Sequence, residues 1–401
     1  MEEADATGAG EHILTVNSPM RIVFLHHANV CRGGIERVFC QKANYLAEQK
    51  GWQVTMLTYE QNGELYPYEL SPKVDCVNLD VRLYSAYQAP LLLRPFRRWQ
   101  LCRQLLLALR RFLAMHKTDV VVCTDKDAHE QQALLMAHTT ERLVVEAHTG
   151  MIDHVYYQHE SISPFRRMVA AWGYRALRHT VSRFDALAAL TPDDARSWQQ
   201  LVSRVVCLPN ALSFYPPESA SPEADAHRII AVGRLTYQKG FDLLLQAWSR
   251  VERAHPDWRL DIFGDGDDLP VLTRQLASLH LHRAAIHPAT PAIYDEYMQS
   301  AFLVCSSRWE SFGLILIEAM SCGLPVVSFD CDNGPRNIIA HGTTGLLAVN
   351  GDADNLAVCM NHLIADSSLR RSMGAEARQQ AARYKEETVL EQYAQFYASL
   401  A

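Results

Sequence analysis

The sequence predicts an α/β protein built from two doubly wound parallel-sheet domains that face each other. Short, continuously apolar segments alternate with longer segments of helical periodicity along most of the chain. That alternation is typical of parallel strands covered by helices on both faces. It is interrupted once, near the middle of the chain, by a stretch with the composition of a linker. The length of 401 residues fits two or three domains better than one.

The first half of the chain contains four apolar segments that we interpret as buried strands. They are Arg21–His27, Gln53–Thr58, Asp119–Thr124 and Arg142–Ala147. A helical pattern over Ile35–Gln49 follows the first of them after a glycine pair. We therefore expect an N-terminal domain over residues 20–212, preceded by a frayed, acidic first segment, Met1–Pro19.

Residues 213–227 (SFYPPESASPEADAH) are rich in Pro, Ser and Glu, which is typical of a linker. A second alternating series predicts a C-terminal domain over residues 228–384. Its elements are expected at Arg228–Val232, Arg259–Phe263, Phe302–Ser306 and Pro325–Phe329 (strands) and at Phe241–Ala254 and Gly313–Ser321 (helices). An amphipathic pattern over Val389–Leu400, within residues 385–401, predicts a last helix that packs back on the N-terminal domain.

The composition excludes several classes of protein. Hydrophobic residues make up 48% and charged residues 21%, which is typical of a folded globular chain. The net charge of −7 argues against nucleic acid as a partner. The chain shows neither a signal peptide nor an apolar run long enough to span a bilayer, so we expect a cytoplasmic protein. The ten cysteines form no C-x-x-C pair and the 17 histidines no H-E-x-x-H motif, so no metal site is expected.

The stretch Arg308–Asp330 contains two carboxylates in chemically informative positions. Glu310 follows a predicted strand just before the helix that begins near Gly313, and Glu318 lies inside that apolar helix. Two carboxylates near the free amides of a helix N-terminus suit a ligand that bears both hydroxyls and phosphates, such as a sugar nucleotide. The alternative is that Glu310 caps the helix and Glu318 is exposed, and the spacing alone does not choose between them.

Two cations follow the first strand of the second domain. Arg234 comes directly after that strand and Lys239 precedes the next helix, a junction where cations bind a diphosphate. If they neutralise a departing nucleoside diphosphate, that step requires no metal ion. The alternative is a pair of ordinary surface cations.

Gly33 and Gly34 lie between the first strand and the first helix, where glycines let a ligand approach the backbone. His148 ends a predicted strand at the carboxyl edge of the sheet. The alternatives are a simple turn and a structural histidine. Gly264-Asp265-Gly266 lacks the third glycine of a dinucleotide fingerprint, so we expect no NAD site.

Taken together, these stretches resemble a retaining glycosyltransferase of family 4, with the GT-B architecture of two Rossmann-like domains and an interdomain cleft. The resemblance is strongest from residue 228 to residue 347. The segments that carry it are GRLTYQKGFDLLLQAW, FGDGDD, SSRWESFGLILIEAMSCGLPVVSFD and NGPRNIIAHGTTGLL. The two glutamates, with seven residues between them, match the E-x(7)-E signature of the family.

The resemblance implies a role for each candidate residue. Glu310 is expected to contact hydroxyls of the transferred sugar, and Glu318 the ribose diol of the nucleotide. His148 matches the histidine near the donor sugar and the reaction centre, so His148 and Glu310 are the candidate catalytic residues. The residues expected to bind the donor phosphates, through side chain or backbone, are Gly33, Gly34, Arg234, Lys239, Phe312, Gly313 and Leu314.

The family mechanism implies transfer with retention of anomeric configuration, no metal-bound leaving group and no tightly bound cofactor. A UDP-sugar is favoured over a GDP-sugar by family frequency alone, and the sugar would be a hexose or an N-acetylhexosamine. The chain departs from many relatives at Arg336, where an acidic residue is common, and at His287-Pro288, where a glycine is common. This variant looks like enzymes that build bacterial surface polysaccharide.

Two basic stretches in the predicted acceptor domain point to the acceptor. Residues 91–117 carry seven Lys or Arg and residues 161–184 carry five Arg, in both cases without an acid. Basic amphipathic stretches suit an anionic membrane surface or a lipid diphosphate. We therefore expect a saccharide or lipid-linked acceptor and peripheral attachment to the inner face of the cytoplasmic membrane. The alternative is two helices with solvated basic faces.

Two other functions fit the same architecture. A nucleotide-sugar epimerase would hold the donor without an acceptor and would leave the basic stretches unexplained. A non-catalytic protein that binds a nucleotide sugar would not need the full set of candidate residues.

Overall fold

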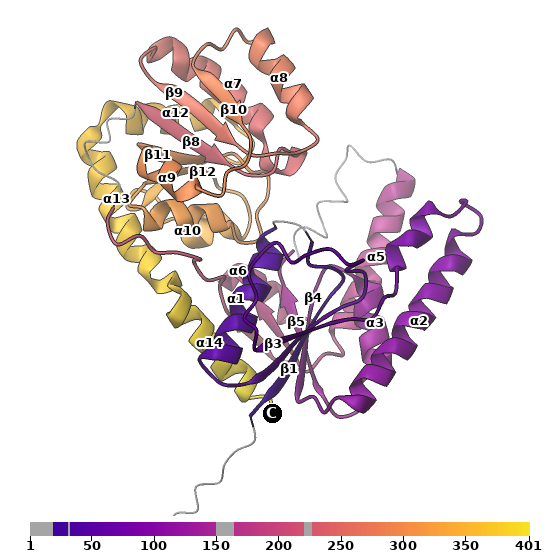
Figure 1. The fold of residues 1–401 in the computed structure, drawn as a ribbon. Helices are drawn as coiled ribbons and strands as arrows, with labels where there is room; N and C mark the ends of the chain where they lie inside the picture. The colour runs from indigo at the N-terminus through magenta and orange to yellow at the C-terminus, as the bar shows by residue number, and fades with distance from the viewer. Residues whose placement is uncertain (1–18, 31–32, 150–163, 220–226) are drawn as a thin grey trace, which may run out of the picture.

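The computed structural model describes residues 19–30, 33–149, 164–219 and 227–401. Parts of three predicted features therefore lie outside the described residues: positions 1–18 of the first segment, 161–163 of the second basic stretch and 220–226 of the linker. Figure 1 shows two α/β domains, with the yellow C-terminal helices passing from the second domain along the first. The prediction of two parallel-sheet α/β domains is confirmed.

The N-terminal domain is built on a seven-stranded sheet in the order β3-β2-β1-β4-β5-β6-β7, in which every pairing is parallel. Its strands are β1 (Arg21–His26), β2 (Gln53–Thr58), β3 (Val74–Asn78), β4 (Val120–Thr124), β5 (Arg142–Ala147), β6 (Ala186–Ala189) and β7 (Val205–Cys207). Its helices are α1 (Gly34–Glu48), α2 (Arg94–Met115), α3 (Ala128–Ala137), α5 (Pro164–Val181) and α6 (Pro192–Trp198), with the 3₁₀ segment η1 (Leu83–Gln88) before α2.

The C-terminal domain repeats this plan with a six-stranded parallel sheet in the order β10-β9-β8-β11-β12-β13. Its strands are β8 (Arg228–Val232), β9 (Arg259–Phe263), β10 (Ala284–His287), β11 (Phe302–Cys305), β12 (Val326–Phe329) and β13 (Gly345–Ala348). Its helices are η2 (Tyr237–Lys239), α7 (Phe241–Ala254), α8 (Leu269–Ser278), α9 (Ile293–Met298), α10 (Leu314–Ser321), α11 (Gly334–Ile338), α12 (Ala353–Ala365), α13 (Ser367–Ala381) and η3 (Ala382–Tyr384).

Both faces of each sheet are buried, as continuous apolar strands require. In β1, Val23 and Leu25 point into one core with α2, α3 and α5, whereas Ile22 and Phe24 point into another with α1. Complete burial of one such side chain stabilises the fold by about 1.5–3 kcal/mol. Successive residues of β1 therefore enter the two cores in turn, and neither side of the strand faces solvent.

The last helix, α14 (Glu386–Ala398), belongs to the core of the N-terminal domain although it follows the C-terminal domain in sequence. Val389, Leu390 and Tyr397 pack against Phe24 and against α1 on the same sheet face. Figure 1 shows α14 beside α1, on the opposite side of the sheet from α2. The chain thus passes between the two domains twice, once between β7 and β8 and once through η3.

The strands that the sequence did not predict are short and atypical. β3 (VDCVN) is an edge strand with exposed polar residues, and β6 (ALAA) consists mainly of alanine, a poor strand former. β7 (VVC) has three residues and is the other edge strand of the first sheet, and β10 (AAIH) and β13 (GLLA) are the edge strands of the second. Across the described ranges, no helix combines the length and the apolarity needed to cross a membrane.

Candidate active site

The site in the C-terminal domain lies where the strand order reverses, between β8 and β11. Ligands of doubly wound sheets bind at such a switch point, beyond the carboxyl ends of the strands. Backbone contacts hold the loops that follow these two strands together. The Arg308 amide donates to the Gln238 carbonyl at 2.8 Å, and the Ser306 hydroxyl donates to the Lys239 carbonyl at 2.9 Å.

Glu310 and Lys239 meet at this junction. The Lys239 ammonium forms an ion pair with Glu310 Oε1, which also accepts a hydrogen bond from the Ser307 hydroxyl at 2.7 Å. Glu310 is buried, and Gly313 rather than Glu310 occupies the N-cap position of α10. The capping alternative for Glu310 is therefore wrong. Burial would lower the pKa of Lys239, but the Glu310 carboxylate outweighs it and raises that pKa.

Glu318 is also buried, so the alternative that it is an exposed helix residue is wrong. Arg37 Nη2 of α1 donates to Glu318 Oε1 at 2.6 Å, and the Tyr297 hydroxyl donates to Glu318 Oε2 at 3.3 Å. Burial, followed by the nearby Glu318 charge, raises the pKa of Tyr297 well above its ordinary value. The phenol is thus a fixed donor to the carboxylate.

The two domains touch through the residues that flank the candidate site. Besides the Arg37–Glu318 pair, the Ser311 hydroxyl donates to the Thr149 carbonyl at 2.5 Å. A Cβ placed on Gly34 would lie 3.3 Å from Leu314 Cδ1 at the start of α10. These contacts place the His148 segment beside the Glu310 loop, and the glycine turn beside the N-terminus of α10.

His148 is buried at the carboxyl end of β5. Its Nε2 lies 2.8 Å from Glu146 Oε2, and its backbone amide donates to Asp125 Oδ1 at 3.0 Å. Lys42 Nζ lies 2.5 Å from the same Glu146 oxygen, with both side chains inaccessible to solvent. Burial would raise the pKa of Glu146, but Lys42 and His148 outweigh it and lower that pKa to about 2. Glu146 is therefore an ionised carboxylate inside the protein.

The remaining predicted residues occupy different environments. Arg234 lies two residues beyond β8 and is exposed, and its carbonyl accepts a hydrogen bond from the Thr236 amide at 2.9 Å. Within the described ranges its guanidinium group has no hydrogen bond or ion pair. Phe312 is buried, and Gly313 has φ +89°, a value that favours glycine. Gly33 is the N-cap of α1. The structure brings Lys239, Glu310, Glu318, Gly34, Leu314 and the His148 segment to the junction of the domains, whereas the Arg234 side chain stands apart from the ion pairs.

Sequence analysis missed three polar residues of this region, Arg37, Lys42 and Glu146. Their signal was the same one that identified Glu318, a charged residue inside an apolar or amphipathic element. Glu146 interrupts the apolar strand RLVVEA, and Lys42 lies in the middle of α1 among buried positions. A charge at a core position predicts a partner of opposite sign.

The residues at which this sequence departs from many relatives have polar partners in the structure. Arg336 pairs with Asp330 at 3.1 Å and with Asp332 at 3.0 Å, so its charge is neutralised locally. His287 Nε2 lies 3.0 Å from Asp261 Oδ1. Gly264, in the motif set aside as a dinucleotide site, is a packing glycine. A Cβ there would lie 1.8 Å from the Gly233 carbonyl oxygen, in the loop that leads to Arg234 and Lys239.

Each half of the chain matches a known protein family. The profile of "Glycosyltransferase Family 4" matches residues 32–214, and that of "Glycosyl transferases group 1" matches residues 217–380. A sucrose-phosphate synthase from Thermosynechococcus elongatus superposes with a TM-score of 0.77 at 20% identity, covering 95% of this chain and 99% of that one. The Anabaena protein HepE, in complex with UDP and glucose, gives a TM-score of 0.69 at 18% identity over 95% and 100% of the two chains.

The fold is therefore that of the GT-B glycosyltransferases, two facing Rossmann-like domains with a domain-crossing C-terminal helix. Each domain also matches a glycosyltransferase family model, and on these two matches together the chain belongs to the family-4 glycosyltransferases.

Curated relatives differ in how much of their length the chain spans. An uncharacterised glycosyltransferase of Haemophilus influenzae is 25% identical over 90% of this chain and 95% of its own. An exopolysaccharide phosphotransferase of Streptomyces coelicolor is 31% identical over 54% of this chain but only 23% of its own. The amylovoran biosynthesis glycosyltransferase AmsD of Erwinia amylovora is 34% identical over 42% of this chain and 47% of its own. The chain thus spans less than half of two of these relatives.

We predict that Gly240→Ala unfolds the C-terminal domain at lower denaturant concentration than the matched variant Gly351→Ala. Gly240 follows Lys239 with φ +62°, and an added Cβ would lie 2.1 Å from the Ser306 carbonyl oxygen. Gly351 has φ +79° with nothing within 4 Å of the added Cβ. Gly351→Ala should therefore cost only the left-handed backbone strain, about 1 kcal/mol, and Gly240→Ala about 2–4 kcal/mol. Urea unfolding measures both, and equal losses would contradict the close approach.

Proposed function

We propose that this protein is a retaining glycosyltransferase. It moves a hexose or N-acetylhexosamine from a nucleotide-diphosphate sugar to a saccharide or lipid-linked acceptor in cell-surface glycan synthesis. One observation carries this proposal. An ion pair between the buried Glu310 carboxylate and the half-buried Lys239 ammonium lies at the β8/β11 switch point, and the hydrogen bond from Ser311 to Thr149 brings the His148 segment of the other domain beside it.

The donor would bind along the C-terminal side of the domain junction. Lys239 and Arg234 would neutralise its diphosphate, and the first amides of α10 have no intrahelical acceptor and would donate to the phosphates. Glu318 would bind the ribose diol and Glu310 the sugar hydroxyls. Because Lys239 and Ser307 both donate to Glu310, its carboxylate has a fixed position.

The proposed reaction breaks the bond between the anomeric carbon and the donor phosphate oxygen. The acceptor hydroxyl oxygen forms the new bond on the same face, and its proton passes to an oxygen of the departing phosphate. His148 and Glu310 would orient the sugar while positive charge develops on it, and the two cations would stabilise the charge on the leaving diphosphate. The proposed step uses neither a metal ion nor a tightly bound cofactor. The complex of HepE with UDP and glucose supports a UDP-sugar as the donor, in preference to a GDP-sugar.

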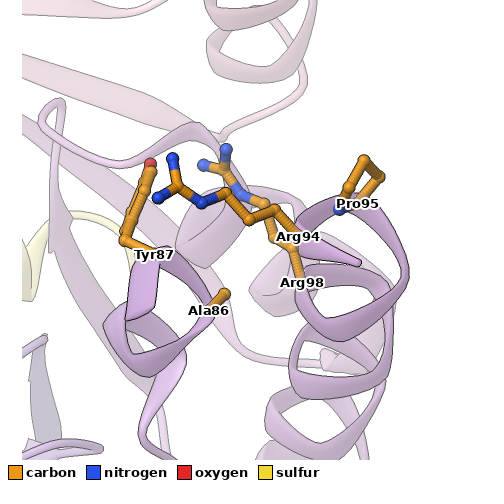
Figure 2. A pocket seen from close by; sticks show the side chains of 5 residues that line it. All are labelled: Ala86, Tyr87, Arg94, Pro95 and Arg98. Carbon is orange, nitrogen blue, oxygen red and sulfur yellow. The ribbon is translucent and has the colours of Figure 1, made fainter. Parts of the chain in front are cut away.

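The acceptor would reach the site from the N-terminal domain, whose α2 carries the first basic stretch. Apolar residues just before this helix and in its first turns are exposed, as for Leu92, which is 94% exposed, and Trp99, which is 58% exposed. Figure 2 shows the guanidinium groups of Arg94 and Arg98 extending toward Tyr87 over a pocket of about 300 Å³. Exposed apolar side chains interleaved with guanidinium groups suit the interface of an anionic membrane.

The opposite face of α2 holds it against the domain. Leu101, Leu105 and Leu109 are buried at i, i+4 and i+8, so the apolar residues at its first turns lie outside the core stripe. In α5, the described arginines Arg175 and Arg178 are exposed. We propose peripheral attachment to the cytoplasmic leaflet, where anionic lipids concentrate.

The first test of the function is Glu310→Gln, which keeps the shape of the side chain but removes its charge. We expect glycosyl transfer to fall by about a hundredfold or more, because the lost carboxylate no longer holds the sugar hydroxyls or Lys239. The control is Asp242→Asn, which removes a charge from the Arg308 pair in the neighbouring loop. Unchanged turnover in Glu310→Gln, with the control unaffected, would refute the assigned site.

A second test identifies the donor by thermal shift with UDP-, GDP- and ADP-sugars. A ligand that binds only the folded state stabilises it by about 2.7 kcal/mol at a concentration of one hundred times Kd. We expect the UDP-sugars to raise the Tm most, and Lys239→Met to abolish the shift. Turnover of the donor without an acceptor, giving an isomerised sugar, would favour an epimerase instead.

A third test addresses membrane attachment by co-sedimentation with vesicles that contain phosphatidylglycerol. Binding should fall as salt rises, since the Debye length shrinks from about 10 Å at 0.1 M to about 3 Å at 1 M. The double variant Leu92→Ser/Trp99→Ser should weaken binding about tenfold, because both side chains lose apolar burial in the interface. Met115→Ser, at the other end of α2 and also exposed, is the matched control. Absence of binding at low salt would exclude the attachment.

A further inference from the structure

We propose that Glu146 is a positioning residue that fixes the ring of His148, and that Tyr397 of α14 completes the set of donors holding Glu146 in place. The inference rests on the proposed function insofar as His148 faces the donor sugar. The contacts themselves belong to the fold and can be measured without any substrate.

The Glu146 carboxylate receives three polar partners from three separate elements. Oε2 accepts from Lys42 Nζ of α1 at 2.5 Å and lies 2.8 Å from His148 Nε2. Oε1 accepts a hydrogen bond from the hydroxyl of Tyr397 in α14. The Glu146 side chain is fully buried, and the described groups that surround it are donors. An acceptor-only carboxylate is thus matched to donors on both oxygens.

This geometry determines the tautomer of His148. Because an ionised carboxylate can only accept, the ring nitrogen facing it, Nε2, carries the proton. With the proton on Nε2, an uncharged ring has its lone pair on Nδ1, which under the proposed function would meet a substrate hydroxyl. The ring is also held by Phe39, whose centroid lies 5.6 Å away in an edge-on arrangement. Glu146 and Phe39 therefore fix the orientation of the His148 ring, and Glu146 also fixes the position of its proton.

Lys42 connects this cluster to α1, the helix that begins at the glycine turn. It lies on α1, two turns after Gly34, and its ammonium rests 3.7 Å from the centroid of the Tyr393 ring. A buried cation between a carboxylate and an aromatic face is satisfied by both. The helix that begins at the glycine turn and the strand that ends at His148 are thus fixed to one another.

Tyr397 connects the same cluster to α14, the helix that returns from the C-terminal domain. Its neighbour Tyr393 lies one turn earlier and is equally buried, but the Tyr393 hydroxyl donates to the Leu208 carbonyl at 2.9 Å instead. The two phenols can therefore be compared directly by mutation. Each supplies one buried hydrogen bond from α14, and only one of those bonds reaches Glu146.

The decisive experiment compares Tyr397→Phe with Tyr393→Phe in the full-length protein. Both keep the ring and lose one buried hydroxyl, so both should lower the Tm similarly. We expect Tyr397→Phe to lower kcat about tenfold with an unchanged donor KM, since the altered His148 acts in the transition state rather than in binding. Tyr393→Phe should leave kcat within about twofold of the parent protein. Equal kcat values for the two variants would reduce Tyr397 to a packing residue and overturn its part of the proposal.

A measurement independent of turnover tests the tautomer. In histidine-¹⁵N-labelled protein, with the His148 signals assigned by their loss in His148→Gln, we expect the Nε2–H tautomer in the parent. The Glu146→Gln variant should show a mixture of tautomers, because an amide can donate as well as accept. An unchanged Nε2–H pattern in Glu146→Gln would overturn the role of Glu146.

If Glu146→Gln does not fold, the double variant Lys42→Met/Glu146→Gln removes both buried charges together and keeps the NMR test possible. If the parent protein binds no nucleotide sugar and transfers none, the proposed function fails while the NMR result still decides the role of Glu146. The two failures are therefore distinguishable.

Discussion

The proposed site and its support are built on three buried carboxylates, each of which is matched by a cation. Glu310 is paired with Lys239, Glu318 with Arg37, and Glu146 with Lys42. Removing a carboxylate from water costs several kcal/mol, and removing one partner of such a pair costs about 3–5 kcal/mol. Two of the pairs join elements within one domain, and the Arg37–Glu318 pair joins the two domains. The relative position of the domains is therefore coupled to charges within the proposed site.

The loops that carry these charges are held by backbone approach as much as by ion pairs. Gly264 brings the loop after β9 against the loop after β8, where a side chain would not fit. Gly240 does the same between η2 and the end of β11. The site is thus a set of backbone segments packed edge to edge, and the charged side chains extend from positions that tolerate little displacement.

The sequence predicted the fold class and most of the central strands because buried parallel strands are continuously apolar. β2, β5, β8 and β9 have the predicted bounds, whereas β3 and β6 were missed because their residues are polar or are alanine. The candidate residues on loops could be identified from motif spacing. Their partners could not, because Arg37 lies 281 positions from Glu318 and Tyr397 lies 251 positions from Glu146, and spacing along the chain carries no record of such contacts.

The return of α14 to the first domain has a consequence for the order of synthesis. One face of the first sheet, which α1 covers only in part, leaves Phe24 and its neighbours incompletely buried until residues 386–398 have left the ribosome, by which time the whole second domain has been made. The first domain therefore cannot complete its core while it emerges, although its seven strands precede the second domain. Exposed apolar strands at that stage attract chaperones and aggregation. The apolar residues of β1 thus depend for their final burial on a helix that is made more than 350 residues later.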